Sequence, residues 1–233
     1  MMPPRHRGPR RRRTWAWPGV LALLAATTPA HALSPAEVFA KVSASVWKVV
    51  GLDADGLPLG QGSAVVVARR TLVTNCHVLA KARSVLLRHG STSVPAQLSA
   101  WDVQRDLCQL NAAAVEAPPV ALGDSARLAV GQVAYAIGHP RGLDLTMSEG
   151  LVSSFRRNAA GQLLLVQTSA AISGGSSGGG LFDERGDLVG LTTIGSTANA
   201  QNLNFAIPAQ WIQDLPRRHA AALAAKAASA DAR

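Results

Sequence analysis

The chain has 233 residues, a formal net charge of +9 and only two cysteines. That length is enough for one large domain or two small lobes with a buried core. The positive charge would suit a nucleic-acid partner, but six of the 23 basic residues are arginines close to the N-terminus. The other 17 basic residues face 14 acidic ones, so we expect no nucleic-acid partner.

Residues 1–32 have the layout of a secretory signal peptide. Arginines precede an apolar stretch at Val20–Ala26, and Ala30-His31-Ala32 supplies an A-x-A cleavage site. The apolar stretch is too short to cross a membrane as a helix. We therefore expect cleavage after Ala32, a periplasmic or secreted protein, and no stable membrane span afterwards. An uncleaved anchor is the alternative, and both Sec and twin-arginine export remain open.

The first half of the mature chain has the pattern of short β-strands. Ser34 can cap a short helix that begins at Pro35. After it, brief apolar stretches alternate with Gly, Pro, Asp and Asn, which is typical of strands joined by turns. The predicted strands lie at 45–51, 62–68, 71–74, 84–88, 94–100 and 107–111.

A second set of strands follows a linker predicted at 114–125. These strands lie at 132–137, 146–155, 163–168, 181–183, 188–194 and 203–207. The pattern predicts an all-β chain with two six-stranded antiparallel β-barrels, at about 45–113 and 126–208. A short C-terminal helix and an Ala-rich tail, which we expect to fray, occupy 211–233.

The segment 174–180 contains five glycines and two serines inside this strand-rich region. Alone, it could be a flexible linker. So much glycine also suits a backbone that makes a close approach or adopts a positive φ. Acyl-transfer enzymes hold a nucleophilic serine in such a turn, beside free N–H groups.

His77 follows one apolar strand, and Asp106 begins another. Each alone is more often structural than catalytic, but the two precede the serines in the order His, Asp, Ser. Asp102 is a competing carboxylate, although it lacks the apolar stretch that follows Asp106. The segment around Ser177 also fits the G-x-S-x-G pattern of α/β-hydrolases, which place the histidine last and require a parallel sheet. That class is therefore excluded.

The segments TNCHVL, RDLCQL and GSSGG resemble the triad segments of trypsin-fold serine proteases, most closely the Deg/HtrA-like bacterial branch. The resemblance implies two six-stranded barrels with the active site between them, in a protease domain at 33–210. Deg/HtrA proteins often carry PDZ domains, and we expect none in this chain. The resemblance extends to the segments 135–143, 148–155, 167–193 and 204–208.

The resemblance also implies a role for each triad residue. Ser177 would be the nucleophile, His77 the general base, and Asp106 the group that orients the imidazole. The N–H groups of Gly175 and Ser177 would form the oxyanion hole. Ser176 stands where digestive relatives carry an acid, so activation by a freshly cut N-terminus is not expected. No cofactor or metal is expected.

The same resemblance predicts the residues of the specificity pocket. Ala171 would lie at its base, Thr193, Ile194 and Gly195 would form its wall, and Asn204 would border it. With no carboxylate at the base, we expect a small or apolar residue before the cleaved bond.

The two cysteines flank the expected His–Asp pair. Cys76 precedes His77, and Cys108 lies two residues beyond Asp106. A folded triad would bring their backbones together, so we expect a disulfide, with two buried free thiols as the alternative.

The predicted function is an exported serine endopeptidase that cleaves unfolded or flexible proteins through an acyl-enzyme intermediate. One alternative is a trypsin-fold binding or chaperone-like module with little turnover. Another is an esterase on the same fold. The expected partners are protein or peptide substrates, and the sequence does not predict an oligomeric state.

Overall fold

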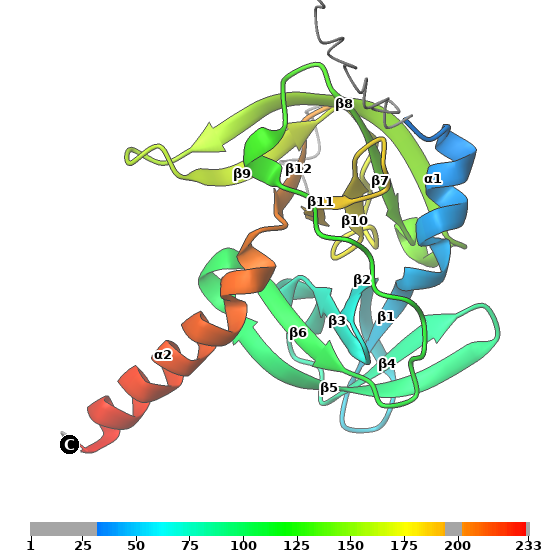
Figure 1. Cartoon of the computed structure of the whole chain (residues 1–233). Coiled ribbons are helices and arrows are strands. Elements are labelled where there is room, and N and C mark those ends of the chain that lie inside the picture. The colour runs from blue at the N-terminus through cyan, green and yellow to red at the C-terminus, as the bar shows by residue number, and fades with distance from the viewer. Residues whose placement is uncertain (1–31, 194–201, 232–233) are drawn as a thin grey trace, which may run out of the picture. The chain divides into compact units, whose positions relative to one another are not determined.

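The computed structural model describes residues 32–193 and 202–231, and the first six strands in this part form a closed antiparallel barrel (Figure 1). The order of neighbouring strands is β1-β2-β3-β6-β5-β4. The bounds are β1 Val46–Leu52, β2 Pro58–Ala68, β3 Thr71–Thr74, β4 Ser84–His89, β5 Thr92–Asp102 and β6 Leu107–Asn111.

The other six strands of the described residues form a second closed barrel, in the order β10-β11-β12-β9-β8-β7. This confirms the predicted pair of six-stranded antiparallel barrels. The bounds are β7 Val133–Gly138, β8 Thr146–Arg157, β9 Leu163–Thr168, β10 Gly180–Phe182, β11 Leu188–Thr193 and β12 Asn204–Pro208.

Strand alternation gives each barrel two buried surfaces. Successive side chains of a strand point to opposite faces. In β1, Trp47 and Val49 pack inside the first barrel, whereas Val46 packs into a core shared by both barrels. That shared core also contains Phe182 and Leu191 from the second barrel. The two barrels therefore bury apolar surface against each other as well as inside themselves.

The N-terminal helix α1 (Pro35–Val42) begins as predicted, with a capping box between Ser34 and Glu37. Although α1 precedes the first barrel in sequence, it contacts a turn of the second. Lys41 Nζ donates to the carbonyl of Arg185 over 2.5 Å, and Leu33 N donates to the carbonyl of Glu184 over 2.9 Å.

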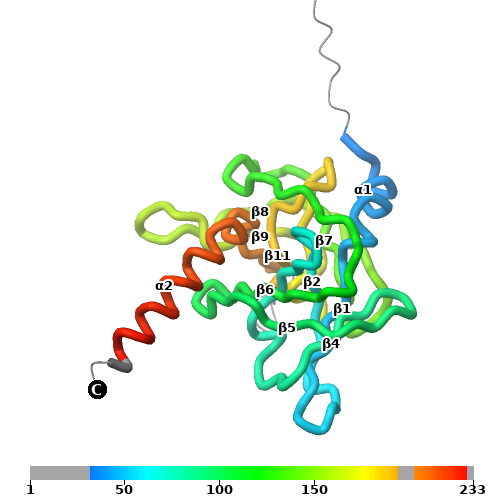
Figure 2. The backbone as a smooth tube through the Cα atoms, turned by 60° about the horizontal axis from the view of Figure 1, so that its bottom comes forward, coloured from blue at the N-terminus to red at the C-terminus, as the bar shows by residue number. Residues whose placement is uncertain are grey.

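The C-terminal helix α2 (Trp211–Asp231) contacts the first barrel, in the reverse arrangement. Figure 2 shows α2, in orange to red, leaving the second barrel and running past β5. Ile212 and Leu215 are buried in the shared core. The helix reaches Asp231, so it is longer than the short helix and frayed tail expected. In the part of the chain that the structure describes, no helix has the length and apolar character needed to cross a membrane.

The strand bounds differ from the prediction most clearly in β2, which begins at Pro58 and not at residue 62. Residues 58–61 are exposed and lack an apolar alternation, so the sequence gives no strand signal there. They extend the strand because β1 continues beside them, with Gly51 opposite Gly60 and Leu52 opposite Pro58.

Candidate active site

His77 and Asp106 lie at the same end of two neighbouring strands. Strand β3 pairs with β6 so that Thr74 is opposite Cys108. His77 follows β3 in the short 3₁₀ helix η2 (Cys76–Leu79), and Asp106 directly precedes β6. The pairing of these strands therefore brings together two residues that are 29 positions apart.

The Asp106 carboxylate contacts His77 twice. One oxygen is 2.6 Å from the ring nitrogen Nδ1, and the other accepts a 2.9 Å hydrogen bond from the backbone N–H of His77. A carboxylate can only accept, so Nδ1 carries the shared proton. The second ring nitrogen, Nε2, is then an acceptor in the neutral imidazole. This is the tautomer in which Nε2 can take a proton from a nucleophile.

The backbone of Asp106 is held by neighbours of His77. Its carbonyl accepts hydrogen bonds from Asn75 Nδ2 at 3.0 Å and from Cys76 N at 3.3 Å. The expected disulfide between Cys76 and Cys108 is present. Asn75 is fully buried and lies within the TNCHVL motif, but its role could not be predicted from sequence because its partner is distant in the chain.

Asp102, the competing carboxylate, lies in a different environment. It is bound by the guanidinium of Arg218, and Arg105 Nε lies 3.8 Å from the same carboxylate. Asp106, and not Asp102, is therefore the carboxylate in contact with His77.

The segment that carries Ser177 requires glycine at two positions. Gly175 and Gly178 have φ values of +92° and +82°, which L side chains rarely adopt. A Cβ at Gly175 would lie 2.6 Å from the carbonyl oxygen of His139, and one at Gly178 would lie 2.1 Å from that of Ser63. The glycine-rich segment is therefore a tightly packed turn and not a linker.

Two side chains that sequence reasoning missed hold this turn. The Ser63 hydroxyl donates to the carbonyl of Gly175 and accepts from His139 N, each over 2.9 Å. The Thr192 hydroxyl donates to the carbonyl of Ser176 over 2.6 Å. Serine and threonine are common in strands, so nothing in the sequence distinguishes these two from the rest.

Ser177 lies close to η2. The position of a Cβ on Gly62 would be within 3 Å of both the Val78 side chain and the Ser177 carbonyl oxygen, so the two residues flank Gly62. Ser177 is only 1 % exposed, and its Oγ has no hydrogen-bond partner among the described residues. It therefore makes no hydrogen bond to His77. The N–H groups of Gly175 and Ser177 also have no partner within this part of the chain.

A cavity of about 80 Å³ is lined in part by this turn. Ala171 lines it, as do Ser173, Ser176 and Thr192, and none of its lining side chains is charged. Two of the other predicted pocket residues, Thr193 and Asn204, are not in its lining. Thr193 ends β11 and Asn204 begins β12, whereas Ile194 and Gly195 lie outside the described residues.

His139 lies next to the turn and is buried. Burial, followed by the nearby charges of Lys48 and His89, lowers the pKa of His139 to about 4. The imidazole is therefore neutral at physiological pH. Among residues 32–193 and 202–231, no group of three or more His, Cys, Asp or Glu side chains is arranged to hold a metal ion.

Comparisons with known proteins agree with this geometry. The model of the trypsin-like peptidase domain matches residues 62–191. The serine endoprotease DegS of Haemophilus influenzae is 34% identical over 167 residues, which cover 67% of this chain and 49% of that protein. A DegP-like periplasmic serine endoprotease of Pseudomonas putida is 35% identical over 155 residues, which cover 64% of this chain and 32% of that protein.

The structural comparison gives the same result. The solved structure of the HtrA-type protease AlgW with a tripeptide has a TM-score of 0.70 and 32% sequence identity. The match covers 78% of this chain and 63% of that one. The chain spans half or less of the length of the two curated relatives, DegS and the DegP-like endoprotease.

Proposed function

Because this chain belongs to the trypsin-like peptidase family, we propose that it is a serine endopeptidase with His77, Asp106 and Ser177 as its catalytic triad. One observation carries the proposal. Asp106 orients the imidazole of His77 with Nε2 left as an acceptor, and the next residue of η2, Val78, flanks Gly62 together with Ser177. A base, its orienting carboxylate and a nucleophile are the parts that acyl transfer requires.

In the proposed reaction, Ser177 Oγ attacks the carbonyl carbon of the cleaved peptide bond while His77 Nε2 takes the hydroxyl proton. The tetrahedral intermediate collapses when the C–N bond breaks, and His77 returns the proton to the leaving amine. Water then attacks the ester formed on Ser177 while His77 takes a proton from it, and the ester bond breaks as His77 returns that proton to Ser177 Oγ. The Asp106 carboxylate stabilises the charged imidazole.

The oxyanion of the intermediate would bind to the backbone of the turn. The N–H groups of Gly175 and Ser177 have no partner among the described residues, so both are available to donate. Donors fixed in advance stabilise the developing charge without reorganisation, and removing one typically costs about 10²–10³ in rate.

We propose small or apolar residues before the cleaved bond, in substrates that are unfolded or flexible proteins. Ala171 supports this preference because it offers neither charge nor bulk at the predicted base of the pocket. The uncharged lining of the adjacent cavity is consistent with it.

We further propose that residues 1–32 direct export to the periplasm or the exterior, and that residues 33–210 form the protease domain. The signal-like composition, the periplasmic relative and the disulfide support this location. Disulfides persist mainly in oxidising compartments.

The test uses Ser177→Ala with Ser176→Ala as the matched neighbour. A fluorophosphonate probe should label the wild type at Ser177, and both wild type and S176A should cleave casein. S177A should fold normally, take up no probe at that position and show no cleavage. Cleavage by S177A at the wild-type rate would refute the proposed nucleophile.

A binding or chaperone-like module is the second candidate, because Ser177 Oγ is buried and makes no hydrogen bond to His77 within the described residues. Catalytic hydrogen bonds often tighten only when substrate binds. The same probe separates the two candidates. Labelling at Ser177 supports the peptidase, and no labelling with or without an unfolded protein substrate supports the binding module.

A further inference from the structure

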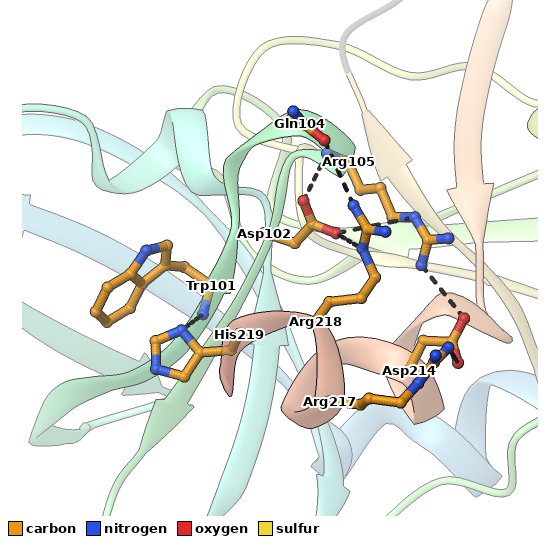
Figure 3. Close-up of polar contacts among 8 residues, drawn as sticks. All are labelled: Trp101, Asp102, Gln104, Arg105, Asp214, Arg217, Arg218 and His219. Carbon is orange, nitrogen blue, oxygen red and sulfur yellow. Dashed lines mark hydrogen bonds and ion pairs between the residues drawn. The ribbon is translucent and has the colours of Figure 1, made fainter. Parts of the chain in front are cut away.

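Asp102 links the C-terminal helix to the segment that carries Asp106 (Figure 3). It is the last residue of β5 and is 8 % exposed. One carboxylate oxygen caps the short 3₁₀ helix η3 (Val103–Arg105) by accepting from Arg105 N, and the other is bound by Arg218 Nε from α2. A nearly buried carboxylate thus has one partner in each element.

Further contacts surround this ion pair. Arg105 Nη1 lies 3.4 Å from Asp214 of α2, and its guanidinium lies 4.6 Å from the centre of the Trp211 ring. On the other side, the backbone N–H of Trp101 donates to His219 Nδ1 over 3.5 Å, and the two rings meet edge-on. The end of β5 and two residues of η3, Gln104 and Arg105, are therefore held by the first turns of α2.

Only η3 separates this contact from the catalytic pair. Asp106 directly follows η3 and has the left-handed conformation, with φ 53° and ψ 39°. Aspartate tolerates that region better than most residues, but it persists only where the surroundings impose it. Because η3 has three residues, a shift of its start at Asp102 would move the Asp106 carboxylate at its end.

We propose that Arg218 is a positioning residue for the His77–Asp106 pair, acting through Asp102 and η3. By binding Asp102, Arg218 fixes the turn that sets where Asp106 meets the imidazole. Docking of α2 on the first barrel is then a requirement for an oriented base as well as for stability. The expected kinetic effects rest on the proposed peptidase function. The expected effect on the contact between Asp106 and His77 does not.

The Arg218 guanidinium remains charged throughout an assay. The hydrogen bond to Asp102 raises the pKa of Arg218 above its usual value. A pH dependence of the wild-type activity would therefore not arise from deprotonation of this guanidinium.

Arg217 provides a matched control on the same helix. Its side chain is 80 % exposed and pairs only with Asp214, at 3.1 Å, among the described residues. Arg217→Met and Arg218→Met remove the same charge and leave the same side chain, but only R218M releases Asp102. Arg218→Lys restores the positive charge with a different geometry.

The kinetic experiment measures hydrolysis of a small ester and the rate of fluorophosphonate labelling, together with thermal unfolding of each variant. R218M should lower kcat by about 10- to 100-fold at a similar KM, as expected for a small displacement of a catalytic group. R218K should recover part of the rate, and R217M should stay within about twofold of wild type. A folded R218M with wild-type kcat would overturn the inference.

A double-mutant cycle tests the route through Asp102. If Arg218 acts through that carboxylate, Asp102→Asn should lower kcat by itself, and the double variant should be no slower than the slower single variant. Losses that multiply in the double variant would overturn the proposed route. D102N tests the same link if R218M does not fold.

A spectroscopic measurement separates this inference from the proposed function. The proton between His77 Nδ1 and Asp106 should give a ¹H NMR resonance downfield of the amides, whether or not the protein hydrolyses anything. The signal should shift or broaden in R218M and D102N and stay unchanged in R217M. An unchanged signal in folded R218M or D102N would overturn the inference, whereas wild type that never labels at Ser177 would overturn only the peptidase function.

Discussion

At the scale of single residues, the turn around Ser177 depends on two glycines that cannot be exchanged for alanine at low cost. The Cβ of an alanine at Gly178 would lie 2.1 Å from the Ser63 carbonyl, in a backbone conformation with φ +82°. By contrast, Gly174 in the same turn has nothing within 4 Å of its Cβ position.

The first prediction compares Gly178 with Gly174. Gly178→Ala should lower the free energy of unfolding by about 2–4 kcal/mol, because left-handed strain adds to overpacking. Gly174→Ala should change it by less than about 0.5 kcal/mol, as expected of a surface substitution. Urea unfolding curves measure both, and equal stability of the two variants would contradict the packing described here.

A second prediction concerns His139, which is 6 % exposed and has a pKa lowered to about 4. As pH falls, the unfolded chain takes up this proton first, near the ordinary value of 6.5. The contribution of neutral His139 to the free energy of unfolding is therefore fully present above pH 6.5 and is lost as the pH falls toward 4. That loss amounts to about 3 kcal/mol.

The measurement is urea unfolding between pH 7 and pH 4.5 for wild type and His139→Gln. Other groups titrate equally in both proteins, so the variant should lose less stability over this range than wild type does. Parallel curves for the two proteins would show that His139 is not held neutral.

At the scale of elements, η2 and β6 are joined by the Cys76–Cys108 disulfide directly beside the His–Asp pair. The third prediction is that Cys76→Ser with Cys108→Ser lowers the free energy of unfolding by about 3–4 kcal/mol, because the loop closed between the two cysteines gains freedom in the unfolded chain. Thermal unfolding of the double variant, compared with reduced and oxidised wild type, measures the effect. Oxidised wild type no more stable than the variant would refute it.

The strand pattern could be predicted from sequence because most strands bury one or both faces. The bounds of β3, β6 and β9 are those expected, and each is dominated by apolar residues between turn signals. The predicted start of β2 and the predicted length of α2 were wrong. The exposed end of β2 depends on its pairing with the distant strand β1. The second half of α2 is exposed and rich in alanine, so the helix propensity of these residues accounts for the extra length.

The candidate site divides in the same way. His77, Asp106 and Ser177 stand in motifs whose order and neighbours could be recognised, and the structure places the first two in contact. Ser63 and Asn75 could not be found because their role is a hydrogen bond to a backbone carbonyl far along the chain. Arg218 gave no signal either, since a charged residue on a polar helix is usually solvated.

At the scale of the whole molecule, the core between the barrels joins both halves and the C-terminal helix. Leu215 of α2 is fully buried in this shared core, whereas Leu223, two turns later, is 46 % exposed. The fourth prediction is that Leu215→Ala lowers the free energy of unfolding by about 2–5 kcal/mol and that Leu223→Ala has little effect.

Because the core is shared, both variants should still unfold in one step. Tryptophan fluorescence and far-UV circular dichroism should give coincident urea curves, as expected for a cooperative unit. Two separate transitions in L215A would show that the barrels are held together less tightly than their common core implies.

Each terminal helix contacts the barrel that lies farther from it in the sequence. Helix α1 contacts the turn at 184–187 of the second barrel, and α2 contacts β5 of the first. A chain cut within the linker at 114–125 would therefore yield two fragments, each carrying a segment that belongs on the other. Neither fragment would bury its own terminal helix alone, but together they would supply every missing contact. The fold thus has the connectivity of a split protein whose halves regain their terminal-helix contacts only on reassociation. By the role proposed for Arg218, the His–Asp pair would regain its orientation in the same step.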